Sequence, residues 1–449
     1  MPDTLKSVAD EKLSTAKKIV EKLKSAGFEA YFVGGCVRDF VRGVKPVDYD
    51  IATSALPEQV TQIFKKTVEY GAKFGVIAVV QDGNTFEVAT FRRDDIYEDG
   101  RRPKKIHYSD AREDVLRRDF TVNGLLMDPE TGEVIDYVGG RADIEKKIIR
   151  TIGDPLIRFS EDYLRMLRAV RFAANLNFTI ENKTFSIIRE NSHKIKIISA
   201  ERIQDELTKI ITRQGARRGM ELMKETGLLS HLLPEIEKLE KVEQPPRFHP
   251  EGDVWQHTLI MLELLSPEKN GNFNPALAWA ALLHDAGKAD TKTEDAKGVH
   301  FYGHVKRGEE LADNIMKRLR FSRVQLEIIK ELIHYHMVFM NVQKMRPGRL
   351  KRFLRMPNFD LHLELHRLDC LASHGMLDNY EFCVQQLKKL AIEDLHPQRL
   401  ITGDDLIALG YEPGKMMGRI LKKLENEQLE GKIKTKDEAL TFVEENWRK

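Results

Sequence analysis

Cysteine is scarce in this 449-residue chain, which carries only Cys36, Cys370 and Cys383. Thiols so few and so far apart cannot build a disulfide framework or a thiolate zinc site. Long apolar runs are also missing, since none approaches the roughly 20 residues that cross a bilayer. The first residues lack the basic and then apolar pattern of a secretory signal. We therefore expect no membrane partner and a cytoplasmic location.

An excess of charge of one sign is absent as well. The chain has 72 basic and 70 acidic residues, a net charge of +2. This balance does not by itself indicate a nucleic-acid partner, although a local basic surface is enough to bind phosphates. Hydrophobic residues make up 41% and charged residues 32%, which is typical of a folded protein long enough for several domains. Composition excludes little else and says nothing of the reaction.

Apolar periodicity divides the chain into a mixed α/β part and a helical part. Before residue 150 we expect helices at 11–26 and 57–66 and strands at 30–33, 49–52, 76–80 and 85–91. From Asp154 onward we expect helices at 158–176, 199–213, 215–228, 257–266, 275–284, 305–319, 323–337, 347–355 and 361–373. Polar, proline-bearing stretches at 241–250 and at His396-Pro397 are candidate linkers.

A glycine pair precedes the first pattern that carries chemistry. Gly34 and Gly35 follow the first expected strand and open Gly34-Gly35-Cys36-Val37-Arg38-Asp39. Glycines at such a position let the backbone approach a triphosphate, and the N-terminus of a following helix favours anionic oxygens. Alone, however, a Gly-Gly pair is an ordinary turn.

Paired carboxylates follow about a dozen residues later, as Asp48-Tyr49-Asp50. On a strand, Asp48 and Asp50 share one face because side chains alternate. Two such carboxylates can hold a pair of magnesium ions, and Glu87 on a later strand can supply a third. An isolated Asp-x-Asp is more often a solvated loop, but the combination with the glycine turn reverses those odds. The arrangement resembles the polymerase-β-type nucleotidyltransferase superfamily.

Further motifs narrow the resemblance. A basic pair and polar groups suited to triphosphate and ribose follow, at Arg117, Arg118, Asp119 and Asn123. With the segments 136–140, 152–155, 161–172 and 201–207, they resemble the ordered motifs of the class II tRNA nucleotidyltransferase (CCA-adding enzyme) and bacterial poly(A) polymerase family. One departure is Gly124, where that family usually carries alanine.

This resemblance implies an α+β fold, with a small polymerase-β-type head that contains a mixed sheet. The domains expected are a head at 1–150, an all-helical neck at 151–240, a metal-binding domain at 241–385 and a helical tail at 386–449. It also implies template-independent addition of CMP and AMP from CTP and ATP to the 3′ end of tRNA, with Mg²⁺ at Asp48 and Asp50 and release of pyrophosphate.

In that family an Asp and an Arg three residues apart on the neck helix select the base. Asp162 and Arg165 have this spacing, and on one helix they would share a face. Asp162 can accept and Arg165 can donate hydrogen bonds, so the pair can read the edge of a base. Arg168 and Arg171 continue the stripe and would meet phosphates. Without the preceding motifs, such a stripe is usually a solvated helix face.

The polar segment from Arg92 to Leu116, with Asp99-Gly100-Arg101-Arg102-Pro103 inside it, resembles the flexible loop of enzymes that add the terminal adenosine. It argues against an enzyme that adds cytidine alone. An adenosine-only enzyme and a poly(A) polymerase remain alternatives to full CCA addition.

A second set of ligand-type residues lies in the helical part. His257, the pair His284-Asp285 and the distant Asp369 resemble the ligands of the HD phosphohydrolase superfamily, and His304 and His334 could complete a second position. Imidazole with carboxylate suits a divalent transition metal, and Lys288 could contact a phosphate. Fourteen histidines will place some beside carboxylates by chance, so the order of the set carries the argument. In related CCA-adding enzymes, such a domain is associated with phosphatase and 2′,3′-cyclic phosphodiesterase activity.

The tail around Gly410 and Gly414, with Lys415, Arg419, Lys422 and Lys423 after it, resembles the tRNA-contacting tail of the same enzymes. A rival from another class is an HD phosphohydrolase whose head only binds RNA. The intact Asp48 and Asp50 argue against it. Oligomeric state does not follow from the sequence.

Overall fold

The computed structural model describes residues 3–71, 75–94, 106–265, 267, 273–296, 298–390 and 398–447. The chain divides into two compact units, Met1–Pro234 and Glu235–Lys449, here named the N-terminal and the C-terminal unit. The finer boundaries expected at residues 150, 240 and 385 remain predictions.

A mixed sheet of seven strands forms the centre of the N-terminal unit, in the order β3-β4-β5-β2-β1-β8-β9. Strands β2 and β5 run parallel, whereas the other neighbours in this sheet are antiparallel. The strands are β1 (Ala30–Val33), β2 (Asp50–Thr53), β3 (Thr67–Gly71), β4 (Val76–Gln81), β5 (Asn84–Thr90), β8 (Leu125–Met127) and β9 (Val134–Asp136). The mixed sheet within an α+β unit confirms the expected fold class.

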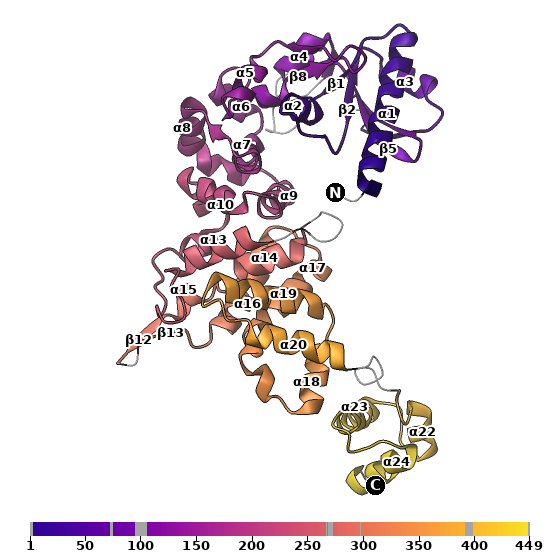
Figure 1. The fold of residues 1–449 in the computed structure, drawn as a ribbon, viewed down its shortest axis with the longest axis vertical. Coiled ribbons are helices and arrows are strands. Elements are labelled where there is room, and N and C mark those ends of the chain that lie inside the picture. The colour runs from indigo at the N-terminus through magenta and orange to yellow at the C-terminus, as the bar shows by residue number, and fades with distance from the viewer. Residues whose placement is uncertain are drawn as a thin grey trace. The chain divides into compact units, whose positions relative to one another are not determined.

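Helices on the sheet close its core (Figure 1). The helices α1 (Asp3–Ser25) and α3 (Pro57–Ile63) contact each other and the sheet, while α2 (Gly35–Val41) leads from β1 toward α5 (Gly140–Glu145). The short α4 (Ala111–Leu116) packs its Ala111 and Val115 on Val33, Ala52 and Leu126. These residues share one sheet face because strand side chains alternate. Asp50 lies two positions before Ala52, so its side chain is on the face that α4 covers.

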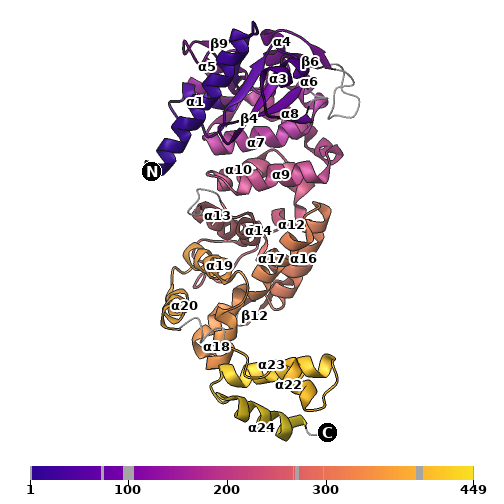
Figure 2. The same cartoon turned by 90° about the vertical axis from the view of Figure 1, so that its right-hand side faces the viewer.

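The rest of the N-terminal unit is helical, with α7 (Leu164–Leu176) packed against α9 (Ala200–Ile211) and α10 (Ala216–Glu225). Figure 2 shows α7, α9 and α10 as neighbouring helices. Its other elements are α6 (Pro155–Glu161), α8 (Asn182–Asn191), α11 (Leu228–Leu232), the 3₁₀ helices η2 (Thr121–Asn123) and η3 (Ser192–Ile197), and the short strands β6 (Arg92–Asp94), β7 (Ile106–Tyr108), β10 (Ile148–Ile149) and β11 (Thr179–Ile180).

The C-terminal unit is built around α13 (Val254–Leu264), α14 (Pro275–Leu283), α17 (Arg323–Tyr335) and α19 (Phe359–Ala372), which pack on one another (Figure 2). Here α14 is apolar on every side, as expected for a helix surrounded by others. The remaining elements are α12 (Pro234–Glu237), α15 (Lys288–Thr291), the hairpin β12 (Thr293–Asp295) with β13 (Gly298–His300), α16 (His304–Arg318), the 3₁₀ helix η4 (His336–Lys344), α18 (Pro347–Leu354), α20 (Asp378–Lys389), α22 (Gly403–Ala408), α23 (Lys415–Leu429) and α24 (Lys436–Trp447).

Most expected elements are present, with one consequential error. The predicted helix at 158–176 is two helices, α6 and α7, separated at Asp162 and Tyr163. Strands β6 and β7 pair at the base of the long polar segment, but Asp99 to Pro103 lie outside the described residues, as does His396-Pro397. No helix in the described part of the chain combines the length and apolar character that a membrane span needs.

Candidate active site and metal centre

The two aspartates of the first motif lie at the start of β2. Asp50 is the first residue of the strand, whereas Asp48 lies just before it, so the expectation that both stand on the strand is wrong. The alternation nevertheless holds, because Tyr49 is buried and packs its ring on Phe32, 5.5 Å between centroids, while both aspartates are exposed. The buried tyrosine therefore turns both carboxylates outward.

Glu87 comes to the same place through the parallel pairing of β2 with β5. Ile51 pairs with Val88. Asp50 and Glu87 each come one residue before these partners, so they are neighbours across the two parallel strands. Removal from water raises the pKa of Asp50 to about 6, and the negative charges of Glu87 and Asp48 add to this effect while Arg118 opposes it. Lys12 donates to Asp48, with 2.5 Å between Nζ and Oδ1. The cluster thus holds more negative charge than its neighbours neutralise, which fits a site for divalent cations.

The glycine turn lies directly against these carboxylates. Gly34 has a φ of +71°, and a side chain there would begin 3.4 Å from Nη1 of Arg118 and 4.0 Å from Oδ2 of Asp50. These are ordinary van der Waals distances, so the positive φ, and not a lack of space, favours glycine at this position. Gly35 begins α2, and its α-carbon faces the guanidinium of Arg38.

Arg117 and Arg118 follow α4 and share one buried carboxylate that the sequence analysis missed. Asp114 is fully buried and accepts from Nη2 of Arg117 at 2.6 Å and from Nη2 of Arg118 at 3.0 Å. Burial alone would raise the pKa of Asp114, but the two guanidinium groups outweigh burial and lower it. Asp114 precedes Arg117 by three residues and Arg118 by four, a spacing that brings side chains together on a helix. A helix was not expected here from the sequence, so the spacing was not used.

The other predicted nucleotide-binding residues form one connected polar chain between the sheet and α7. Arg38 donates to the Asn123 side chain at 2.8 Å, Asn123 donates to Asp119 at 3.3 Å, and Asp119 accepts from Arg168 at 2.8 Å. Arg168 and Arg171 both donate to the buried Glu206, at 3.4 and 2.7 Å. The structure therefore brings these residues together and uses Arg168 and Arg171 in ion pairs, and their contact with a nucleotide stays a prediction.

Asp162 and Arg165 do not share the face of one helix, contrary to expectation. Asp162 has extended backbone between α6 and α7, and Arg165 lies in the first turn of α7. Arg202 makes two hydrogen bonds to Asp162, at 3.1 and 2.6 Å, and Arg165 pairs with Glu161. Both groups are thus oriented by partners on neighbouring segments.

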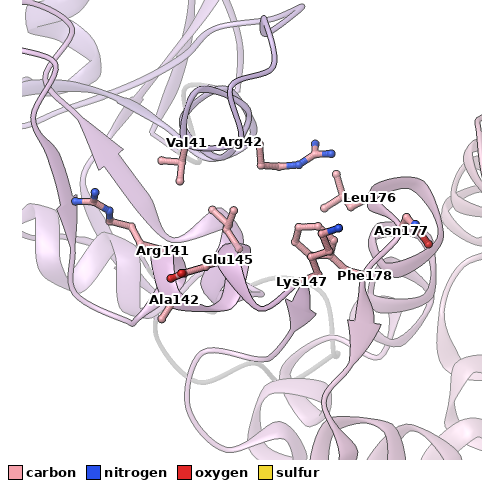
Figure 3. A pocket seen from close by; sticks show the side chains of 10 residues that line it. Val41, Arg42, Arg141, Ala142, Glu145, Lys147, Leu176, Asn177 and Phe178 are labelled. Carbon is pink, nitrogen blue, oxygen red and sulfur yellow. The ribbon is translucent and has the colours of Figure 1, made fainter.

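A pocket of about 650 Å³ lies at the other end of α2 (Figure 3). Arg42, Arg141 and Lys147 line it together with Val41 and Phe178, and the Arg42 guanidinium lies 5.7 Å from the Phe178 ring centroid. None of the predicted site residues lines this pocket.

The C-terminal unit brings most of the predicted ligands together, and three of them, Asp285, His304 and Asp369, line a cavity of about 420 Å³. Among the described residues three sets of possible ligand atoms lie within 4.8 Å of one another. They are His257, His284 and Asp369; Asp285, His304 and His336; and His249, Glu251 and His257, of which His249 and Glu251 were not expected. His334 is not among them, because it is exposed and pairs with Glu309 at 2.8 Å. His336 takes the place predicted for His334. It follows the buried Leu332 and Ile333 by four and three residues, so helical periodicity was the available signal.

Each clustered imidazole is oriented by a hydrogen bond from its Nδ1. The acceptors are the carbonyls of Ala281, Phe301 and Ile333 for His284, His304 and His336, and the carboxylate of Glu251 for His257. Such bonds fix the tautomer and direct Nε2 toward a metal. The Nε2 atoms of His304 and His336 are buried without a hydrogen-bond partner, 3.7 and 3.9 Å from Oδ1 of Asp285.

The pKa shifts in this cluster differ from one imidazole to the next. Burial, reinforced by His284, lowers the pKa of His336 to about 4, so its imidazole is neutral and able to bind a cation. Burial opposes the charged form of His257 as well, but hydrogen bonds with Asp369 and Glu251 outweigh it and raise its pKa to about 9. Lys288 pairs with Asp285 at 2.7 Å. The donor set of imidazoles and carboxylates fits one or two divalent transition metals.

Comparison with known proteins agrees with this geometry. Three families match segments of the chain: the poly A polymerase head domain at residues 30–150, the probable RNA and SrmB-binding site of polymerase A at 177–239, and a putative tRNA nucleotidyltransferase domain 2 at 290–443. These matches and the fold indicate a nucleotidyltransferase.

Relatives along the whole chain are more specific. The CCA-adding enzyme of Ligilactobacillus salivarius is 34% identical over 97% of this chain and 96% of its own length, and that of Streptococcus mutans is 31% identical over 95% and 96%. The crystal structure of the Bacillus stearothermophilus CCA-adding enzyme in complex with CTP has a TM-score of 0.73 and 26% identity, covering 97% of this chain and 98% of that one. The chain belongs to the family of CCA-adding enzymes.

Proposed function

We propose that this chain adds CMP and AMP, from CTP and ATP, to the 3′ end of tRNA and releases pyrophosphate. The observation that carries the proposal is the cluster of Asp48, Asp50 and Glu87 against the Gly34 turn and Arg118. The similar Bacillus stearothermophilus enzyme was crystallised with CTP, and the few, dispersed cysteines favour a cytoplasmic setting.

Magnesium held by Asp48 and Asp50 would supply activation of the attacking hydroxyl and neutralisation of the leaving group. The open backbone at Gly34 admits the triphosphate, and Asp114 holds Arg118 where it can bind phosphate oxygens. The 3′ oxygen of the RNA forms a bond to the α-phosphorus, the bond from that phosphorus to the bridging oxygen breaks, and the hydroxyl proton passes to water. Catalysis is mainly positioning and charge neutralisation.

Base selection would belong to Asp162 and Arg165 at the junction of α6 and α7. Because both are already ion-paired, with Arg202 and Glu161, a base has to share or replace these partners. The tail residues Lys415, Arg419, Lys422 and Lys423, on α23, would hold the tRNA away from the site. Lys423 also pairs with Glu427 at 2.7 Å.

An incorporation assay with three RNAs separates the alternatives. The substrates are tRNA that lacks CCA, tRNA that ends in CC, and an unrelated RNA, each with CTP and ATP. We expect CMP and then AMP on the first, whereas an adenosine-only enzyme extends only the second and a poly(A) polymerase extends all three with AMP. Asp48→Ala and Asp50→Ala should each abolish incorporation, while Asp205→Ala, at an exposed aspartate of α9, should not. Normal turnover of either active-site variant would refute the assignment.

We also propose that the histidine cluster is a metal-dependent phosphohydrolase site, as the HD resemblance implies. The observation in its favour is the set of four buried imidazoles oriented through Nδ1 around Asp285 and Asp369. A bound metal would lower the pKa of a water molecule. In such a hydrolysis the water oxygen would bond to phosphorus, the ester P–O bond would break, and the alcohol would leave with a proton from that water. Lys288 pairs with Asp285 at 2.7 Å and lines the same cavity, so its ammonium group would contact the phosphate.

His334 and His336 offer a matched pair for testing this second function. We expect His336→Ala to weaken Mn²⁺ binding at least tenfold in calorimetry and to remove hydrolysis of p-nitrophenyl phosphate. His334→Ala should change neither, because that ring lies outside the cluster. Equal metal affinities in the two variants would contradict the proposed centre.

A further inference from the structure

The 3₁₀ helix η4 connects the histidine cavity to a second hollow. His336, at the start of η4, belongs to the histidine cluster, and Lys344 is the last residue of η4. A hollow of about 740 Å³ lies beside η4 and the start of α18, here named the η4 groove. Met337 lines both the η4 groove and the histidine cavity, so the two spaces adjoin.

The η4 groove carries an excess of positive charge. Lys344, Arg346, Arg349 and Arg352 line it, against the single carboxylate of Glu430. Within the described part of the chain Lys344, Arg346 and Arg349 are exposed and have no hydrogen-bond or ion-pair partner for their side chains. Arg352 donates to the side chain of Asn426 at 2.7 Å. Three unpaired cations in one hollow fit a ligand with several negative charges.

The length of η4, which separates Lys344 from His336, favours a polymer of phosphates over a single ion. A 3₁₀ helix rises about 2.0 Å per residue, so η4 spans roughly 16 Å from His336 to Lys344. That length corresponds to about five stacked nucleotides at about 3.4 Å per phosphate of one strand. A strand bound at Lys344 and Arg349 therefore reaches the histidine cavity.

Exposed rings at the mouth of the cavity are an independent observation that favours RNA. Phe248 and Tyr302 line the cavity with 49% and 78% of their surface exposed. The ring of Tyr302 also stacks on His300, 5.2 Å between centroids. Aromatic faces beside a basic groove are how proteins hold single strands without regard to sequence, because every base can stack.

We propose that the η4 groove binds the backbone phosphates of an RNA strand and directs its end into the histidine cavity. The substrate of that cavity is then a phosphate at the end of an RNA rather than a free small phosphate ester. The statement about the substrate rests on the phosphohydrolase function proposed above, whereas binding of the strand does not.

Two double variants of matched composition test the binding. Lys344→Ala/Arg349→Ala removes two groove cations, and Lys306→Ala/Arg323→Ala removes two cations of α16 and α17 that have no described side-chain partner. The probe is a fluorescent 12-nucleotide single-stranded RNA with 4-thiouridine as its last base, titrated into the full chain without metal or nucleotide between 50 and 300 mM KCl.

We expect the groove variant to bind this RNA about tenfold more weakly at 100 mM KCl. Its plot of log affinity against log salt should also be flatter by about 1.4, because each lost single-strand phosphate contact removes about 0.7. The control variant should match the wild-type slope. In the wild type the 4-thiouridine should cross-link to peptides containing Tyr302 or Met337, and the groove variant should lose this cross-link. Equal slopes in the two double variants, or cross-links confined to other peptides, overturn the proposal.

Hydrolysis separates the two proposals. With Mn²⁺ present, the groove variant should show a KM at least tenfold higher for a 3′-phosphorylated 12-mer and unchanged kinetics on p-nitrophenyl phosphate. If the groove variant and the control variant turn over both substrates equally well, the assignment of an RNA end as substrate is overturned. If the wild type hydrolyses neither compound, the phosphohydrolase function falls, and the salt slopes and cross-links still decide whether the groove binds RNA.

Discussion

The carboxylate of Asp114 is fully buried, and the two arginines after α4 share it. Asp114→Asn keeps the shape but removes the charge that holds Arg118 beside Asp50. We expect the KM for CTP to rise about tenfold with a smaller fall in kcat, because Arg118 then loses its place beside the triphosphate. The variant should also lose about 3 kcal/mol of stability, since two guanidinium groups are left without their buried partner.

Asp110 of the same helix is the control. Its side chain caps α4 by accepting from the Glu113 amide at 2.9 Å, so Asp110→Ala should cost about 1 kcal/mol and leave KM unchanged. Equal KM values in the two variants would show that Asp114 acts on stability alone. Folding lowers the pKa of Asp114, so its stabilising contribution is complete above the ordinary value near 3.8 and is lost as the pH falls through the folded-state value. The difference between wild type and Asp114→Asn in urea unfolding should therefore persist at pH 5.

Single residues were predictable where a strong local pattern determines exposure. Asp48, Asp50 and Glu87 follow from alternation along two strands, and the structure brings them together. The choice of His334 over His336 was wrong because sequence order alone does not say which histidine faces inward. Asp114 was missed because a six-residue helix inside a polar segment carries too little periodicity to detect.

At the scale of elements, the break between α6 and α7 determines how Asp162 is presented. Its Oδ1 accepts from the Leu164 amide at 3.1 Å and thereby helps to start α7, while Arg202 holds the same carboxylate. We expect Asp162→Ala to lose the hydrogen bond from the Leu164 amide and the ion pair, about 2 kcal/mol together. If Asp162 reads the base, misincorporation of UTP or GTP should also rise at least tenfold.

Arg202→Ala distinguishes the two roles, since it removes the ion pair but leaves the carboxylate and its hydrogen bond with the Leu164 amide. Its melting temperature should fall by roughly 2–4 °C per kcal/mol lost, with base choice close to wild type. A loss of base selection as large as that of Asp162→Ala would mean that the ion pair, and not the carboxylate itself, sets specificity.

Elements with clear periodicity were predictable, and the others depended on the tertiary structure. The strands β1 and β4 and the helices α13, α14, α16, α17, α18 and α19 lie within a few residues of their expected bounds. Strand β8 was not expected because its three residues are all buried and show no alternation. The break at Asp162 has no glycine or proline to mark it. The partner of Asp162 at this break is Arg202, forty positions away in sequence.

At the scale of the whole molecule, each of the two units has its own core and its own candidate metal site. Ligands that bind only the folded state stabilise it by about 2.7 kcal/mol at a hundredfold excess over Kd. We therefore expect two calorimetric transitions in the full chain. CTP with Mg²⁺ should raise only the one that belongs to the N-terminal unit, and Mn²⁺ at low concentration should raise only the other, each by roughly 5–10 °C.

Two variants assign the transitions. Glu206 is buried between Arg168 and Arg171. Glu206→Gln should therefore destabilise the N-terminal unit by about 3 kcal/mol, which lowers the temperature of the transition that CTP raises and leaves the other transition in place. His336→Ala should remove the response to Mn²⁺ without changing the response to CTP. A single transition that shifts with both ligands would contradict this picture, because it would mean that the nucleotide site and the histidine cluster stabilise one cooperative body. Independent shifts would mean that each site can be loaded, and its chemistry tested, while the other is empty.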